Sequence, residues 1–148
     1  MFDVRGKKPT RTLRLIGYWA DGGQDGWPDP TLLVSPHPDA ASQHRVLDYL
    51  RGGTVYAVTG GWSFCRLCGA ANGSVELTDG EHFIWPEGLA HYVSEHNVCL
   101  PDAVTTLMGR PPAPVDVSAF VDGLWRSGRI KVDHDWWCSP YNWTTAGA

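Results

Sequence analysis

The stretch FCRLCG, residues 64–69, carries the strongest structural constraint in this chain, because it places Cys65 and Cys68 two residues apart. This gap lets one tight turn aim both sulfurs at a single point, and Gly69 makes the turn easier. His91 and His96 follow downstream. Two thiolates and two imidazoles form a complete tetrahedral ligand set for zinc. The sequence therefore predicts that one structural zinc ion joins the cysteine turn to the histidine segment.

The segment between the cysteines and the histidines has the pattern of a hairpin followed by a helix. Residues 74–78 and 81–85 are rich in strand formers and flank Asp79-Gly80, a dipeptide favoured in two-residue type I′ turns. Pro86 then suits the first turn of a helix. We therefore expect a two-residue hairpin and a helix from about Pro86 to about His96.

The spacing of the two histidines constrains this helix. At about 100° per residue, His91 and His96 point about 140° apart on an ideal helix, which is too far to share an ion comfortably. Leu89 and Val93 mark the apolar side, and His91 faces away from it. We expect zinc on the His91 side, the core on the other side, and a distorted last turn at Asn97, a residue that tolerates left-handed geometry.

Each ligand has an alternative role that the sequence leaves open. The cysteine pair is also compatible with a redox pair or with simple burial. His96 is also compatible with a hydrogen-bonded core histidine, and His82 on the second hairpin strand is the reserve ligand. If His96 does not bind, the zinc keeps an open position, and Glu87 and Glu95 become candidates for a general base.

The order of turn, hairpin and helix resembles a C2H2-type zinc finger over the segment from Cys65 to about Asn97. The resemblance carries Cys65, Cys68, His91 and His96 onto the four ligand positions. The gap between the second cysteine and the first histidine is 22 residues, against the dozen or so of the common DNA-binding finger. The segment 70–74 is expected to hold the excess, and the DNA-reading role does not transfer with the ligands.

A second likeness lies just beyond the hairpin. The run WPEGLAHYV, residues 85–93, behind the cysteine turn is similar to the pattern of small bacterial proteins. This likeness implies no activity.

The remaining sequence predicts one α+β domain over residues 1–148, with a small mixed sheet, three to four helices and the embedded finger-like unit. The zinc-binding module spans about 62–98, and a C-terminal helix plus tail spans about 115–148. The other expected elements are strands at 12–19, 31–34, 54–58 and 132–138, and helices at 39–51, 101–108 and 117–125. The connector 110–114 is proline-rich and extended. The apolar stripe of the helix at 117–125 includes Phe120 and Trp125, and core packing explains it.

Charge and composition limit the class of partner. The net charge is −4 and the pI is about 5.8, which disfavours a surface built to neutralise many phosphates. The helix expected from Pro86 to Asn97 holds no Lys or Arg, although Lys7, Lys8, Arg11 and Arg14 form a basic N-terminal cluster. No apolar run is long enough to cross a membrane, and the N-terminus lacks a secretory segment, so we expect a cytoplasmic protein.

No complete catalytic motif is present, and we expect a protein that is not an enzyme. The function we expect is that of a zinc-stabilised protein-interaction or accessory module, whose partner is another protein. Exposed aromatic residues anchor such interfaces, and Trp19, Trp27, Trp136 and Trp137 are the candidate contacts. The alternative is that these tryptophans fill the core, and the sequence leaves their exposure open. A nucleic-acid-binding zinc-finger protein is the first alternative, and a zinc-dependent hydrolase is the second.

Overall fold

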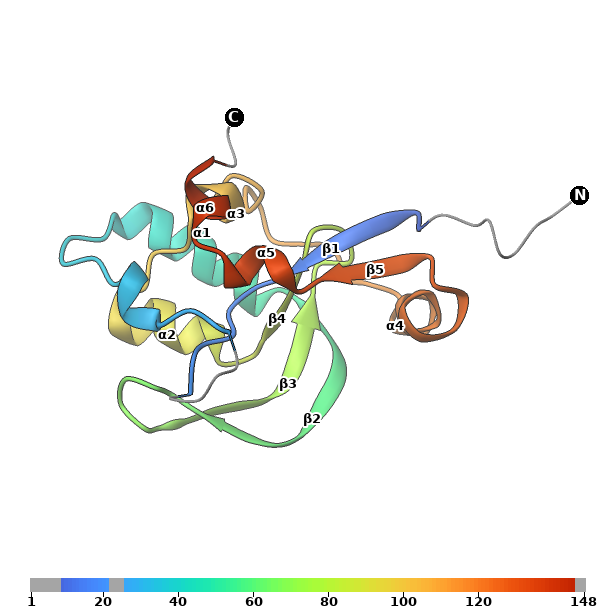
Figure 1. The fold of residues 1–148 in the computed structure, drawn as a ribbon, viewed down its shortest axis with the longest axis horizontal. Coiled ribbons are helices and arrows are strands. Elements are labelled where there is room, and N and C mark those ends of the chain that lie inside the picture. The colour runs from blue at the N-terminus through green and yellow to red at the C-terminus, as the bar shows by residue number, and fades with distance from the viewer. Residues whose placement is uncertain (1–8, 22–25, 146–148) are drawn as a thin grey trace, which may run out of the picture.

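The computed structural model describes residues 9–21 and 26–145, and Figure 1 shows their arrangement. Five strands form one mixed sheet, and six α-helices accompany it in this described part of the chain. In chain order the elements are β1 (Arg11–Leu15), the 3-10 turn η2 (Pro30–Leu33), α1 (Ala40–Arg51), β2 (Thr54–Phe64), β3 (Ala71–Thr78), β4 (Phe83–Pro86), α2 (Leu89–His96), α3 (Asp102–Thr105), α4 (Val117–Asp122), the π turn η3 (Gly123–Ser127), β5 (Ile130–Asp133), α5 (Asp135–Cys138) and α6 (Tyr141–Thr145). The mixed sheet with helices agrees with the expected α+β class, but the six helices exceed the three to four that the sequence predicted, because short helices such as α5 and α6 follow the last strand.

The sheet joins an antiparallel half to a parallel half, in the order β2-β3-β4-β1-β5. β2 pairs antiparallel with β3, and β3 pairs antiparallel with β4. β1 lies between β4 and β5 and runs parallel to both. The chain therefore leaves β1 and β4 at the same edge of the sheet.

Side chains alternate between two apolar clusters on opposite faces of the sheet, as the strand period of two requires. Phe83 and Trp85 belong to the larger cluster, which also takes residues from α1, α2, α5 and α6. Ile84, between them, joins the smaller cluster with Leu13 and Phe120. Figure 1 shows α1 and α2 on one side of the molecule and α4 beside β5 on the other.

Helix α1 forms where the sequence predicts it. The carboxylate of Asp39 accepts a hydrogen bond from Ser42 N at 3.0 Å and caps the first turn, and Gly52 follows the last residue. At the end of the first turn, Gln43 Nε2 donates to Val98 O at 3.1 Å. This bond ties α1 to the chain that leaves α2, so α1 supports the histidine-bearing helix.

The hairpin between β3 and β4 is real, but its two-residue turn is a wrong prediction. β3 ends at Thr78 and β4 begins at Phe83, so four residues rather than two form the connection. Asp79 explains the difference, because its Oδ1 accepts from the N–H groups of residues 81, 82 and 83 while Oδ2 accepts from the Tyr49 hydroxyl. A carboxylate that satisfies three backbone donors stabilises a wider loop than a type I′ turn.

Several other boundaries differ from the prediction: the first strand ends at Leu15 rather than at residue 19, β2 extends to Phe64 rather than ending at residue 58, and α3 covers only Asp102–Thr105. Three further differences have a local cause. Residues 31–33 belong to a 3-10 turn rather than a strand, because Asp29 caps the turn and Pro30 fixes its first φ, and Val34 makes only an isolated bridge with Val98. Pro86 ends β4 instead of opening the helix, and α2 starts at Leu89. The last strand stops at Asp133, whose carboxylate accepts from the N–H groups of residues 135 and 136 and starts α5.

The C-terminal helix also differs from the prediction. α4 passes into the π turn η3, which changes the helical phase, so Trp125 is 65% exposed instead of packed in the core. Phe120 is buried as expected. Lys7 and Lys8 lie outside the described residues. No helix in the described ranges combines the length and the apolar character that a membrane crossing requires.

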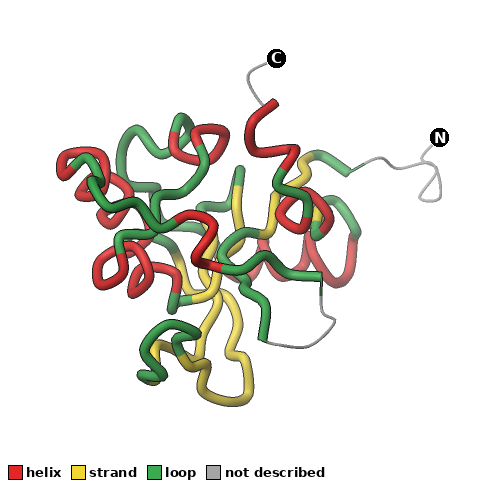
Figure 2. The backbone as a smooth tube through the Cα atoms, turned by 60° about the vertical axis from the view of Figure 1, so that its left-hand side comes forward, coloured by secondary structure: helices red, strands yellow, loops and turns green. Residues whose placement is uncertain are grey.

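The distal half of the β2–β3 hairpin curls away from the sheet and ends beside α2. We call residues 59–73 the arm; Figures 1 and 2 show it extending from the body of the molecule. Val58 pairs with Val75 and Ser63 with Gly73, so four residues of β2 lie opposite one residue of β3. Such a bulge bends a strand, which directs the tip of the hairpin toward α2.

Candidate metal centre

The cysteine turn at the tip of the arm is closed by its own backbone. Gly69 N donates to Cys65 O, and Cys65 N donates to Ala70 O, both at 2.8 Å. Gly69 has a φ of 77°, a left-handed value that explains the glycine there. Leu67 N also points at Cys65 Sγ, at 3.3 Å. The turn therefore presents both sulfurs on one side and donates a hydrogen bond to one of them.

Helix α2 supplies the two imidazoles from its outer face. Leu89, Tyr92 and Val93 are buried against the core, whereas His91 and His96 are half-buried. Asn97 follows in a left-handed conformation with φ 56° and ψ 30°. The two histidine rings lie 5.1 Å apart, centroid to centroid. These observations confirm the expected helix with a core side and an outer side that carries both histidines, and the left-handed conformation expected of Asn97 at its end.

The turn and the helix bring four donor atoms to one place. One ligand atom from each of Cys65, Cys68, His91 and His96 lies within 4.8 Å of all the others. Cys68 Sγ and His91 Nε2 are 3.4 Å apart. Zinc–sulfur bonds of about 2.3 Å and zinc–nitrogen bonds of about 2.0 Å in a tetrahedron give donor separations of about 3.3 to 3.8 Å. The four residues are therefore positioned to hold a metal ion after a small contraction.

The hydrogen bonding of His96 fits a metal ligand. Its Nε2 is buried and finds no hydrogen-bond partner in the described ranges. A buried polar atom without a partner costs about 1–3 kcal/mol, so such atoms are rare in stable folds. A metal ion would supply the missing partner. The alternative of a core histidine with a satisfied hydrogen bond does not fit this nitrogen.

Tyr92 is a supporting residue that the sequence analysis missed. Its hydroxyl oxygen accepts from Arg66 N at 2.7 Å, which fastens the cysteine turn to α2 independently of a metal. Burial raises the pKa of Tyr92 to about 12, and its hydrogen bond with Cys65 acts in the same direction. The hydroxyl is therefore neutral at physiological pH and can donate a hydrogen bond to the sulfur of Cys65. The sequence feature that could have indicated this role is the position of Tyr92 directly after His91.

The other candidates for the centre lie elsewhere. His82 sits in the β3–β4 connection and is not part of the four-residue group. Glu87 Oε1 accepts from Ser74 N at 3.0 Å and thereby holds the start of β3, and Glu95 is exposed. The prediction that residues 70–74 hold the excess length of the 22-residue gap is wrong, because most of this segment belongs to β3. The gap is filled by two strands and their connection.

The structure also locates the four tryptophans expected at a partner surface. Trp19, Trp136 and Trp137 are 5%, 7% and 0% exposed, and Trp27 is half-buried. Trp19 and Trp137 pack on each other, with ring centroids 5.3 Å apart. The first three are therefore core residues in this fold, which corrects their expected place at a surface. The exposed tryptophans are Trp62 and Trp125.

Comparison of the chain with protein-family models, with curated proteins and with solved structures finds no match. The assignment of the centre therefore depends on the geometry and chemistry of the four ligand residues.

Proposed function

We propose that this chain is a small zinc-binding protein of the C2H2 finger type, whose metal is structural and whose role is to present a protein-interaction surface. The observation that carries the proposal is the convergence of two sulfurs and two imidazole nitrogens within 4.8 Å. Zinc is favoured because a tetrahedral set of two thiolates and two imidazoles suits it in structural sites.

A structural rather than catalytic role follows from the number of ligands. A catalytic zinc ion keeps three protein ligands and an open position for water, whereas four nitrogen and sulfur ligands saturate the tetrahedron. Neither Glu87 nor Glu95 belongs to the ligand group. This arrangement disfavours the zinc-dependent hydrolase.

The interaction role is supported by what the metal would hold in place. The arm and the strand leading into it present Val58, Trp62 and Phe64, which are 75%, 67% and 53% exposed. Large exposed apolar side chains that lie close together mark binding surfaces in soluble proteins. A zinc ion at the tip would fix this surface relative to α2.

Nucleic acid remains the alternative partner, and charge disfavours it. Helix α2 has the sequence LAHYVSEH, with no Lys or Arg to contact a phosphate. A net charge of −4 adds to this argument. Affinity capture with the zinc-loaded protein, with and without nuclease treatment, separates the two classes, because only a protein partner survives the nuclease.

The metal assignment is tested by comparing His96→Ala with His82→Ala. The zinc content of each purified protein is measured after dialysis against a weak chelator. We expect one zinc per chain in the wild-type protein and in His82→Ala, and a loss of zinc in His96→Ala. Equal retention of zinc by both variants would contradict the four-ligand centre.

A further inference from the structure

A cavity lined by several aromatic rings lies beside the arm and has a volume of about 440 Å³. Its floor comes from the chain just beyond two parallel strands: residues 17–19 follow β1, Pro86 ends β4, and Gly88 precedes α2. Ligands in α/β sheets bind in the crevice outside the carboxyl ends of parallel strands. The volume is also within the range of small-molecule sites, about 300–1,000 Å³.

The bulge in β2 shapes one wall of this cavity. Thr59 Oγ1 holds the bulge in place through contacts with Gly61 O at 2.8 Å and with Ser74 O at 2.9 Å. Gly60, at φ 79°, takes a conformation that other residues rarely adopt. Thr59, Gly61 and Trp62 all line the cavity. Bulges are common next to binding sites because they redirect side chains, and this one places an exposed tryptophan at the rim.

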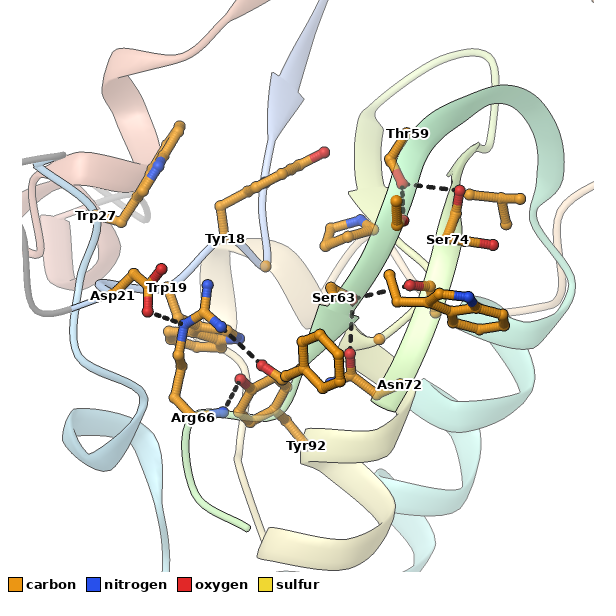
Figure 3. Close-up of a pocket in the computed structure, with 18 residues that line it drawn as sticks. Tyr18, Trp19, Asp21, Trp27, Thr59, Ser63, Arg66, Asn72, Ser74 and Tyr92 are labelled. Carbon is orange, nitrogen blue, oxygen red and sulfur yellow. Dashed lines mark hydrogen bonds and ion pairs between the residues drawn. The ribbon is translucent and has the colours of Figure 1, made fainter. Parts of the chain in front are cut away.

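Aromatic rings from two different parts of the chain line the cavity. Tyr18 and Trp27 pack on each other with centroids 5.3 Å apart and rings tilted by 31°. Figure 3 shows this pair on the side opposite Thr59 and Ser74. Trp62 and Phe64 come from β2 and are more than half exposed. Rings with open faces on a concave surface offer stacking positions for a flat ligand.

The polar groups in the cavity suit an uncharged ligand. Arg66 Nε lies 3.5 Å from Asp21 Oδ1, so one positive charge faces one negative charge. Arg66 Nη1 donates to Phe64 O at 2.8 Å, and the guanidinium has further N–H groups to offer. Asn72 Oδ1 accepts from Ser63 Oγ at 2.7 Å, which leaves its amide N–H groups for a ligand. Figure 3 shows these side chains around the cavity.

Charge excludes two other ligand classes. A quaternary ammonium needs an aromatic cage without a competing cation, and here Arg66 lines the cavity. A phosphate would meet an arginine already paired with Asp21, and the carboxylate of Glu87 lies against Gly73 at the cavity wall. Both a cation and an anion therefore meet a like charge in or beside the cavity.

We propose that this cavity binds the neutral heteroaromatic ring of a nucleobase, presented as a nucleoside or a similar small molecule. Trp62 and Phe64 stack on the ring, and Asn72 and Arg66 bind the acceptors on its edge. Base stacking on aromatic side chains is favourable for every base, and Asn and Arg read the edges of bases by paired hydrogen bonds. This inference goes beyond the metal centre, and it assigns a small-molecule ligand to Trp62 and Phe64, two side chains that also belong to the proposed interaction surface.

The test is calorimetric titration of the zinc-loaded protein with adenosine, guanosine, cytidine and uridine. Glucose, choline and AMP are titrated in parallel. Trp62→Ala removes the exposed stacking ring, and Trp125→Ala is its matched control, because Trp125 is equally exposed and does not line the cavity. Asn72→Ala probes reading of the ring edge.

We expect sub-millimolar binding of at least one nucleoside, and AMP no tighter than adenosine. Trp62→Ala is expected to weaken binding by about 5- to 100-fold, as the loss of one stacked base predicts. Trp125→Ala should stay within twofold, and Asn72→Ala should change the order of preference among the four nucleosides. The proposal is overturned if no nucleoside binds, if glucose or choline binds instead, or if Trp62→Ala and Trp125→Ala have equal effects.

Discussion

Two regions of the molecule are stabilised in different ways. In one region, which we call the apolar end, Leu13, Ile84, Phe120 and Ile130 pack from β1, β4, α4 and β5 and are each at most 7% exposed. In the other, which we call the metal end, the arm meets α2 through four ligand residues and the Arg66–Tyr92 hydrogen bond. The difference teaches that this chain uses coordination where it has little apolar surface to bury.

The composition of the arm explains the need for another stabilising interaction. Residues 60–61 are both glycine, and glycine loses more conformational entropy on folding than any other residue. Trp62 and Phe64 remain more than half exposed, so they contribute little burial. A structural zinc ion binds with a free energy on the order of 10 kcal/mol, enough to order such a segment. We therefore expect a destabilising substitution at the metal end and one at the apolar end to have different effects on zinc binding and on the free energy of unfolding.

The largest expected effect is at the metal end. Cys65→Ser should abolish zinc binding, because serine replaces a thiolate with a poor zinc ligand. Amide hydrogen exchange should then become fast throughout residues 59–73 and in α2, while β1 and β5 stay protected. Cys99→Ser is the matched control: Cys99 is partly buried and lies outside the ligand group. Uniform loss of protection across both ends would contradict a local role for the metal.

The second effect is at the apolar end. Phe120→Ala should lower the free energy of unfolding by about 3–5 kcal/mol, because it leaves a cavity beside Tyr56, whose ring centroid is 5.1 Å away. Zinc content should stay at one per chain. The measurements are denaturant unfolding and metal analysis on the same sample. Trp125→Ala, in the exposed π turn, should cost far less, and loss of zinc in Phe120→Ala would show that the two ends are not independent.

The contrast between the ends also explains which features the sequence predicted. The ligands were recognisable because cysteine and histidine are rare and their spacing has a chemical meaning, and α1 was recognisable from its Asp39 cap. The register of the β3–β4 hairpin was not recognisable from the sequence. Asp79-Gly80 indicates a turn, but the length of the turn depends on which groups donate hydrogen bonds to the Asp79 carboxylate. Here Tyr49, 30 residues away in the chain, donates to that carboxylate.

The cavity beside the arm could not be predicted from the sequence either, because it also depends on contacts between residues far apart in the chain. Its lining residues come from the chain after β1 and from β2, β3, β4 and α2, and the bulge that places Trp62 arises from strand pairing. A strand pattern does not predict where two strands fall out of register. The burial of Trp19, Trp136 and Trp137 was likewise a result of tertiary packing.

A third, smaller effect is expected where α2 ends. Asn97 has a φ of 56°, which costs a β-branched residue about 1–2 kcal/mol and costs glycine almost nothing. Asn97→Val should therefore weaken zinc binding by distorting the turn that carries His96, whereas Asn97→Gly should bind zinc like the wild type. Competition with a chromogenic chelator measures both affinities. Equal affinities for the two variants would contradict the proposed control of His96 by the backbone.

The smallest effect concerns Glu76 on β3, at a cavity that also contains Tyr56 and Leu124 of the apolar end. Burial raises the pKa of Glu76, and nearby His134 opposes the shift. A raised pKa in the folded state means that the folded protein binds the proton more tightly, so stability falls as the pH rises past the pKa of the unfolded chain. Glu76→Gln should be more stable than the wild type at pH 7.

The raised pKa of Glu76 also determines how the difference in stability between Glu76→Gln and the wild type depends on pH. The advantage of Glu76→Gln should shrink as the pH falls through the pKa of Glu76, because the wild-type carboxyl then becomes neutral as well. Thermal unfolding at several pH values measures it, with Glu81→Gln as an exposed control. An advantage that grows toward acidic pH would reverse the assigned direction of the shift.

The most direct test of the metal centre is X-ray absorption spectroscopy at the zinc edge on the purified protein. The account predicts one zinc per chain with two sulfur neighbours at about 2.3 Å and two nitrogen neighbours at about 2.0 Å. A protein that folds and holds no zinc, or a zinc shell without sulfur, would contradict it.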